Sequence, residues 1–276
     1  MPIASVNGVG LYYEESGLGD RTPFVFTGHG RKWWLWQWAY FSEHYRVLTH
    51  DRRGTGFSDD PPGDWSVKDF SEDLLGILDH IGVEKAIVAG HSLGAAVACV
   101  FGLDHPHRVH ALILSGQVYY WDELDNEWVD EMLAGKADLR YQPRSFKWEE
   151  RGPPTTHPEL GSSTIGAYFL KVMSETGKVR SPEQRALNND RMLRSLRGWD
   201  MRPRSDELTK LGARIPVLIM IGGFESQSAI PRAYEWHKAI SGSEFVINQG
   251  CYHACPRENP GLWNERVKGF LERHGL

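Results

Sequence analysis

The feature that most constrains the fold of this chain is a short apolar run that leads to a serine between two glycines. Residues 86–96 read Ala-Ile-Val-Ala-Gly-His-Ser-Leu-Gly-Ala-Ala, with Ser92 at the centre. The first residues favour a buried strand, and the small residues after Ser92 favour a helix that packs closely on a sheet. The turn between such elements has no room for side chains two positions from the serine, so Gly90 and Gly94 are sterically required. The pattern predicts a strained turn that exposes the Ser92 hydroxyl at the carboxyl edge of a sheet.

Similar apolar runs recur along the chain, with helical segments between them. They are short, rich in Val, Ile and Phe, and mostly bounded by Gly or Pro, as buried strands are. Their alternation with helices predicts an α/β fold with a mostly parallel sheet and helices on both faces. The predicted strands are 10–13, 24–27, 45–49, 86–89, 111–114, 217–221 and 244–247.

Two helices are predicted in detail. One spans the region 66–81, where apolar residues recur at helical spacing and Ser66 and Asp69 are placed as a capping box. The other closes the chain after Pro260, a typical start signal. The residues expected to face the core are Phe70, Leu74, Ile77, Leu78 and Ile81 in the first helix, and Trp263, Val267, Phe270 and Leu271 in the second.

Residues 120–205 break this rhythm because they are rich in Arg, Asp, Glu, Trp and Pro and contain no strand pattern. A structureless loop of that length is improbable inside a compact domain, so the segment predicts a helical lid inserted between two strands. The core domain is then formed by residues 1–119 and 206–276. The arginines of the lid could clamp a substrate carboxylate, but their acidic neighbours favour a solvated surface of mixed charge.

Length and charge limit the classes of function. A chain of 276 residues with 41% hydrophobic residues suits one large domain with an insertion. The net charge of −5 and the lack of a basic patch argue against nucleic acid as a partner. The sequence has no apolar run of about 18 residues and no secretory signal pattern, so we expect no membrane partner and a cytoplasmic monomer or homodimer.

Cysteine usage also fits a reducing compartment. The chain has three cysteines and no N-x-S/T glycosylation acceptor. Cys251 and Cys255 flank His253, but a structural zinc site needs four ligands and no second cluster appears, so we expect no metal.

Three further motifs accompany the segment around Ser92. They are Gly28-His29-Gly30 after an early strand, Asp-Arg-Arg-Gly-Thr-Gly-Phe-Ser-Asp at 51–59, and Gly-Cys-Tyr-His at 250–253. Together these motifs resemble the α/β-hydrolase family, in particular lidded esterases, lactonases, cofactor-free haloperoxidases and ring-cleavage-product hydrolases. The resemblance covers nearly the whole chain except the lid. It implies a sheet of the eight-stranded type and an enzyme that needs no cofactor.

The resemblance also implies a set of site residues. Ser92 corresponds to the nucleophile and His253, after the last strand, to the base that takes its proton. Backbone N–H groups of Arg31 and Leu93 correspond to the oxyanion hole. The glycines of 51–59 suit a sharp turn, where Asp51 with either neighbouring arginine is expected to hold the loop rather than take part in chemistry.

The acid that orients the base is expected at Glu225. The family usually places an aspartate there, and a glutamate can hold an imidazole in the same way. Some relatives carry this acid after the preceding strand, where this chain has Gly116 and Gln117. Asp122 and Asp125 remain as alternatives to Glu225.

Aromatic side chains crowd two segments near these motifs. Such residues bring large apolar area at low entropic cost and can line a pocket for a flat or bulky group, although packing between lid and core is the alternative for each one. The predicted pocket residues are Trp33, Trp34, Trp36, Tyr119, Tyr120 and Trp121.

The sequence therefore predicts a serine hydrolase that cleaves a small-molecule carboxylic ester or lactone with an apolar, including aromatic, group through an acyl-enzyme. One alternative keeps the same residues for C–C bond hydrolysis or for perhydrolase or haloperoxidase-like chemistry. Another is a ligand-binding receptor on this fold. An epoxide or haloalkane hydrolase is disfavoured, because those relatives need a carboxylate where this chain has Ser92.

Overall fold

The computed structural model describes residues 2–17, 21–135, 180–226 and 228–276. Eight strands form one sheet in the order β1-β2-β4-β3-β5-β6-β7-β8. The pairs β1–β2 and β2–β4 are antiparallel, and all the others are parallel. In chain order the strands are β1 (Ile3–Val6), β2 (Val9–Ser16), β3 (Pro23–Thr27), β4 (Arg46–His50), β5 (Ala86–His91), β6 (Val109–Ser115), β7 (Val217–Gly222) and β8 (Glu244–Asn248).

The predicted mostly parallel sheet is confirmed, and each of the seven predicted strands corresponds to an observed one. The structure adds β1, which the sequence analysis did not predict. This strand pairs with β2 across a tight turn at Asn7 and Gly8, which have φ 51° and 74°. Asparagine and glycine tolerate these left-handed conformations, so the turn returns the chain at once to form the antiparallel edge.

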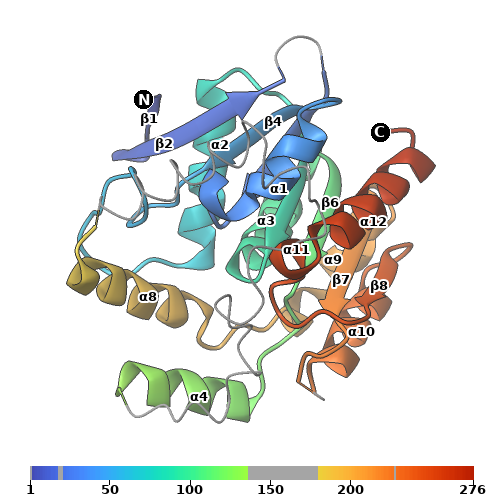
Figure 1. Ribbon diagram of the computed structural model, residues 1–276. Coiled ribbons are helices and arrows are strands. Elements are labelled where there is room, and N and C mark those ends of the chain that lie inside the picture. The colour runs from blue at the N-terminus through green and yellow to red at the C-terminus, as the bar shows by residue number, and fades with distance from the viewer. Residues whose placement is uncertain (1, 18–20, 136–179, 227) are drawn as a thin grey trace.

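Helices cover both faces of the sheet (Figure 1). On one face, α1 (Arg31–Phe41), α11 (Cys255–Glu258) and α12 (Pro260–Arg273) pack on one another. On the other face lie α2 (Val67–His80), α3 (Leu93–Asp104), α9 (Ser205–Gly212) and α10 (Ala229–Ala239). Short 3-10 helices span Pro106–Arg108 and Arg202–Arg204.

Successive residues of the central strands contribute to opposite cores. Phe24 and Phe26 of β3 belong to the cluster that includes residues of α1 and α12, whereas Val25 belongs to the cluster that includes residues of α2 and α3. In the same way, Ile87 and Val88 of β5 lie in different clusters. Side chains alternate along a strand, and both faces are covered, so these strands read as continuous apolar runs.

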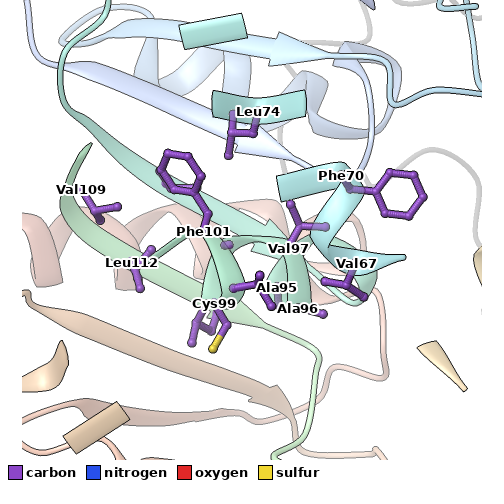
Figure 2. Packing of buried hydrophobic residues seen from close by; sticks show 14 of the residues in the cluster. Val67, Phe70, Leu74, Ala95, Ala96, Val97, Cys99, Phe101, Val109 and Leu112 are labelled. Carbon is purple, nitrogen blue, oxygen red and sulfur yellow. The ribbon is translucent and has the colours of Figure 1, made fainter. Parts of the chain in front are cut away.

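The packing of α3 explains its small residues. Ala95 and Ala96 are fully buried and bring the helix close to the sheet. Figure 2 shows side chains of α2, α3 and β6 gathered in this core, with Leu74, Phe101 and Leu112 among them. The predicted cap of α2 is present as well: the Ser66 hydroxyl accepts from the Asp69 N–H at 3.2 Å, and the Asp69 carboxylate accepts from the Ser66 N–H at 2.7 Å.

Two helices, α4 (Glu123–Leu133) and α8 (Pro182–Leu196), lie between β6 and β7 in the chain and contact each other at one end of the molecule (Figure 1). Arg191 of α8 pairs with Asp60 of the core, with 2.7 Å between Nη1 and Oδ1. Residues 136–179 of the predicted lid lie outside the described residues, so the division into core and lid stays a prediction. In the part of the chain that the structure describes, no helix is long and apolar enough to cross a membrane.

Candidate active site

The turn from β5 to α3 holds Ser92 in a strained conformation. Ser92 has φ 54° and ψ −118°, and Asn7 is the other described non-glycine residue with positive φ. Such a conformation costs on the order of 1–3 kcal/mol and persists only where the surrounding structure enforces it. A Cβ at Gly90 would lie 1.9 Å from the Gly94 carbonyl oxygen, and one at Gly94 would lie 2.3 Å from that of Thr27. The glycines are therefore sterically required, as predicted.

His253 and Glu225 meet at the same edge of the sheet. Glu225 follows β7, and His253 follows β8. The Nδ1–H of His253 donates to Oε1 of Glu225 at 2.7 Å. The Glu225 side chain is 10% exposed and that of His253 is 44% exposed, so the carboxylate is held inside while the imidazole reaches the surface of the site. This bond fixes the tautomer and leaves Nε2 of His253 as the ring nitrogen that can accept a proton.

The surroundings of His253 favour its protonated form. Burial lowers the pKa of His253, but the charge and hydrogen bond of Glu225, together with the charge of Glu258, outweigh it, so that the pKa is raised above its ordinary value. An imidazole in this environment is a stronger base than one in water. It can take a proton from a neighbouring hydroxyl at a lower free-energy cost.

The loop that carries His253 is fixed by Glu258 of α11, a residue that the sequence analysis missed. Its carboxylate accepts from the Tyr252 N–H at 2.6 Å and from the Ala254 N–H at 3.0 Å, on either side of His253. Burial raises the pKa of Glu258, and these two bonds offset that effect only in part. A carboxylate a few residues after a loop, in a short helix with Pro in its first turn, is the signal that could have indicated it.

The alternative acids are occupied elsewhere. Asp122 and Asp125 cap α4 and both pair with Arg232, with 3.4 Å between Asp122 Oδ2 and Arg232 Nη1. The Gln117 side chain accepts from the Val118 N–H at 2.9 Å and from the Trp121 Nε1–H at 3.1 Å. Glu225 is thus the carboxylate of the predicted set that bonds to the His253 ring.

The two residues of the predicted oxyanion hole each begin a helix. Leu93 is the first residue of α3, and Arg31 is the first residue of α1. Their loops are in close contact, because a Cβ at Gly28 would lie 2.3 Å from Cα of Gly94. The N–H groups of a first helical turn carry partial positive charge and suit a developing oxyanion. The Arg31 side chain pairs with Glu14 of β2, with 2.7 Å between Nε and Oε2.

A row of stacked rings links these loops to His253. Trp33 stacks on His29 with 4.7 Å between ring centroids and on His91 with the same separation. The His91 ring in turn lies 4.8 Å from that of His253. Burial lowers the pKa of His29 to about 3 and that of His91 well below its ordinary value, so both rings are neutral at working pH. His253 is thereby placed beside the residue that precedes Ser92.

The predicted pocket residues separate into different environments. Trp33 is half-buried and lines a cavity that is described below. The assignment of Trp34 to the pocket is wrong: its side chain is fully buried and packs on Phe26 and Trp263, with centroid separations of 5.0 and 5.7 Å. Adjacent residues on a helix point about 100° apart, so one faces the cavity and the next the core.

The remaining aromatic residues of that set have different surroundings. The carbonyl of Trp36 accepts from Asn264 of α12 at 3.5 Å. Tyr119 is 7% exposed and belongs to the core on the α3 side. The Tyr120 ring lies 3.9 Å from the guanidinium of Arg202. Their contact with a substrate stays a prediction.

Within the ranges that the structure describes, no group of three or more His, Cys, Asp and Glu side chains could hold a metal ion. Cys251 and Cys255 are buried, and their sulfur atoms lie 2.9 Å apart.

Comparison with known proteins assigns the chain to a family. Residues 26–260 match the family model described as alpha/beta hydrolase fold. The chain is 22% identical to Epoxide hydrolase 1 of Caenorhabditis elegans over 96% of its length and 69% of that protein. It is 26% identical to an Escherichia coli O157:H7 protein provisionally named carbamate hydrolase RutD, over 86% of this chain and 85% of that one. The crystal structure of the enol-lactonase from Burkholderia xenovorans LB400 superposes with a TM-score of 0.74 at 22% identity, over 98% of this chain and 100% of that one. The family and these relatives support a hydrolytic activity, and the chain belongs to the α/β-hydrolase fold family.

Proposed function

We propose that this protein is a serine hydrolase that cleaves a carboxylic ester or lactone through an acyl-enzyme. The observation that carries the proposal is the 2.7 Å bond from His253 Nδ1–H to Glu225, beside a strained turn that holds a serine. A nucleophile, a base and a carboxylate that orients the base form the arrangement that activates a hydroxyl at neutral pH.

The proposed reaction has two halves. First, His253 Nε2 takes the proton of the Ser92 hydroxyl as its Oγ bonds to the carbonyl carbon of the substrate, and the N–H groups of Arg31 and Leu93 stabilise the oxyanion. The C–O bond then breaks, and His253 gives its proton to the leaving alcohol. In the second half, His253 takes a proton from water, the resulting hydroxide attacks the acyl-enzyme, and the acid leaves as Ser92 regains its proton.

The name of one relative suggests a different chemistry, which the residues here do not support. Epoxide hydrolases of this fold use a carboxylate at the position of Ser92, and the ring opens by formation of an ester to that carboxylate. A hydroxyl at this position cannot form such an ester with an epoxide. The identity of 22% carries the fold from that relative but not its reaction.

The test is covalent labelling with a fluorophosphonate probe together with a series of p-nitrophenyl esters of increasing acyl length. We expect one probe per folded chain, attached to Ser92 by mass spectrometry, and hydrolysis that is lost in Ser92→Ala. Ser5→Ala removes an exposed hydroxyl from β1 and serves as the matched control. A folded protein that hydrolyses the esters without labelling at Ser92, or that neither hydrolyses nor labels, would contradict the proposal.

A further inference from the structure

A cavity of about 310 Å³ opens beside the proposed active site. It lies between the loops that follow β3 and β4, the first turn of α1, and helices α8 and α11. His29 and Trp33 form part of its wall, and the same two rings belong to the row that leads to His91 and His253. A series of ring contacts through His29, Trp33 and His91 therefore connects the cavity wall to His253.

The lining of this cavity is strongly cationic. Its charged residues are Lys32, Arg52, Arg180, Arg185 and Arg257, with Asp51 as the carboxylate among them. The Asp51 side chain is held by the Phe57 N–H, which donates to Oδ2 at 2.9 Å. A Cβ at Gly30 would lie 1.8 Å from Asp51 Oδ1, and one at Gly56 would lie 1.9 Å from Oδ2, so this carboxylate is wedged between two loops. One carboxylate therefore stands among five cationic side chains in the lining of this cavity.

Some of these cations have partners in the protein. Arg180 lies 3.7 Å from Asp60, which also pairs with Arg191, and its Nη2 donates to the Ser58 carbonyl. Nη1 of Arg185 donates to the Arg180 carbonyl at 2.6 Å. The guanidinium of Arg257 lies 6.0 Å from the Trp33 ring centroid.

Arg52 differs from them because it is buried. Arg52 is 6% exposed, and its Nη1 has no hydrogen-bond partner within the described residues. Its guanidinium lies 5.8 Å from the ring centroid of Phe70, and the charge of Asp51 opposes the effect of burial on its pKa. Buried charges in proteins are normally paired, since removing an ion from water without a counter-charge is unfavourable. Arg52 lines the cavity and has an Nη1 without a hydrogen-bond partner in the described part of the chain, so a ligand in the cavity can supply that partner.

The electrostatics of neighbouring groups agree with a surplus of positive charge. Burial lowers the pKa of Lys32, and the charges of Arg257 and Arg185 lower it further. Burial and then the charges of Arg52 and Arg257 also lower the pKa of His29 to about 3. Burial lowers the pKa of Arg52 to about 10, which leaves the group charged at neutral pH.

We propose that this cavity binds a carboxylate carried by the substrate, with Arg52 as its principal partner, so that the enzyme prefers esters or lactones of acids with a second, ionised carboxyl group. The inference rests on the proposed function and specifies its substrate class. A planar guanidinium can form two parallel hydrogen bonds to a carboxylate, which fixes orientation as well as charge. The bound carboxylate would anchor one end of the substrate while the scissile carbonyl lies at Ser92.

The first test compares two substrates of equal acyl length, p-nitrophenyl butyrate and mono-p-nitrophenyl succinate. The wild-type enzyme is expected to have the higher kcat/KM for the succinate, and Arg52→Met is expected to reduce the succinate-to-butyrate ratio of kcat/KM at least tenfold, mainly through KM. Arg194→Gln is the matched control on α8, because Arg194 is 45% exposed, pairs with Asp64 and lies outside the cavity. An equal effect of Arg52→Met on both substrates, or a wild-type preference for butyrate, would overturn the proposal.

The second test separates this proposal from the function of Ser92. Succinate binding to Ser92→Ala protein is measured by calorimetry, with the Arg52→Met and Arg194→Gln changes added in turn. We expect saturable binding that Arg52→Met abolishes and Arg194→Gln preserves. If Arg52→Met protein does not fold, Lys32→Gln takes its place and is expected to weaken binding at least fivefold. Binding that depends on Arg52 without labelling of Ser92 refutes the proposed function alone, whereas labelling of Ser92 without such binding refutes the cavity proposal alone.

Discussion

The Nδ1–H of His253 donates to the carboxylate of Glu225 at 2.7 Å, and these residues follow β8 and β7, which are neighbours in the sheet. A glutamate side chain is longer than that of the aspartate usual in the family. The turn after β7 accommodates it, and in this turn the Glu225 N–H donates to the Gly222 carbonyl at 3.3 Å. A Cβ at Gly222 would lie 2.1 Å from the carbonyl oxygen of Tyr252, so the two loops approach closely at a glycine. This contact brings the carboxylate to the imidazole.

Glu225→Gln is predicted to lower kcat by about 10²- to 10⁴-fold, because an amide neither stabilises the imidazolium nor enforces the tautomer. In the wild type, activity should rise with pH through an apparent pKa above 6.5, since the base works in its neutral form and its pKa is raised. In the variant this rise of activity should occur at lower pH. The measurement is kcat/KM from pH 5 to 9, and an unchanged profile at full activity would place the acid elsewhere.

Substitutions at Ser92 should reveal backbone strain. At φ 54° a glycine avoids the clash that any side chain suffers, so Ser92→Gly is predicted to be about 1 kcal/mol more stable than Ser92→Ala, with both inactive. Urea unfolding followed by circular dichroism measures the difference. The same pair of changes at Ser5, in the extended strand β1, should give the opposite order, with glycine less stable. Equal stabilities at position 92 would mean that the turn relaxes.

The buried histidines predict a loss of stability in mild acid. Burial lowers the pKa of His50 to about 4, as it lowers that of His29 to about 3. Below about pH 6.5 each of these histidines takes up a proton in the unfolded chain but not in the folded one. The free energy of unfolding therefore falls as the pH decreases from there, by about 1.4 kcal/mol per pH unit for each group. His50→Gln should remove one such contribution between pH 6 and 5. Urea unfolding at both values tests this, with His44→Gln on the surface as the control, and an unchanged slope would refute it.

The two neighbouring tryptophans of α1 should respond differently to truncation. Trp34→Ala removes a fully buried ring between β3 and α12 and is predicted to cost about 3–5 kcal/mol of unfolding free energy. Trp33→Ala removes a half-buried ring from the cavity wall and should cost less stability but lower kcat/KM, because the His29 and His91 rings lose their common partner. Thermal unfolding and ester hydrolysis measured on both variants test the contrast. A larger stability loss at Trp33 would contradict it.

Much of the fold was predictable because its determinants are local. The glycines around Ser92 are required by contacts within a few residues and with one adjacent strand, and the cap of α2 involves only Ser66 and Asp69. Seven strands were recognisable from continuous apolar composition. The strand β1 was missed because it has four residues and lies at an edge, where alternate side chains are exposed and the apolar signal is weak.

The environment of individual side chains was less accessible. Trp33 and Trp34 are residues of the same type at adjacent positions in the sequence. Only the start of α1 at Arg31 determines which of the two rings faces the core. Arg52 lies in a motif whose arginines were expected to hold a loop. Arg53 does pair with Asp73 at 2.6 Å, whereas Nη1 of Arg52 has no hydrogen-bond partner among the described residues. Arginine side chains are mostly exposed, so no sequence pattern indicates that Arg52 is buried at the wall of a cavity.

The order of the strands has a consequence during synthesis of the chain. Ser92 is translated before Glu225 and His253, which depend on β7 and on the edge strand β8. A nascent or clipped polypeptide that stops before residue 244 can present the strained hydroxyl but has no imidazole beside it. The hydroxyl can therefore acquire its base only after the residues up to His253 have left the ribosome.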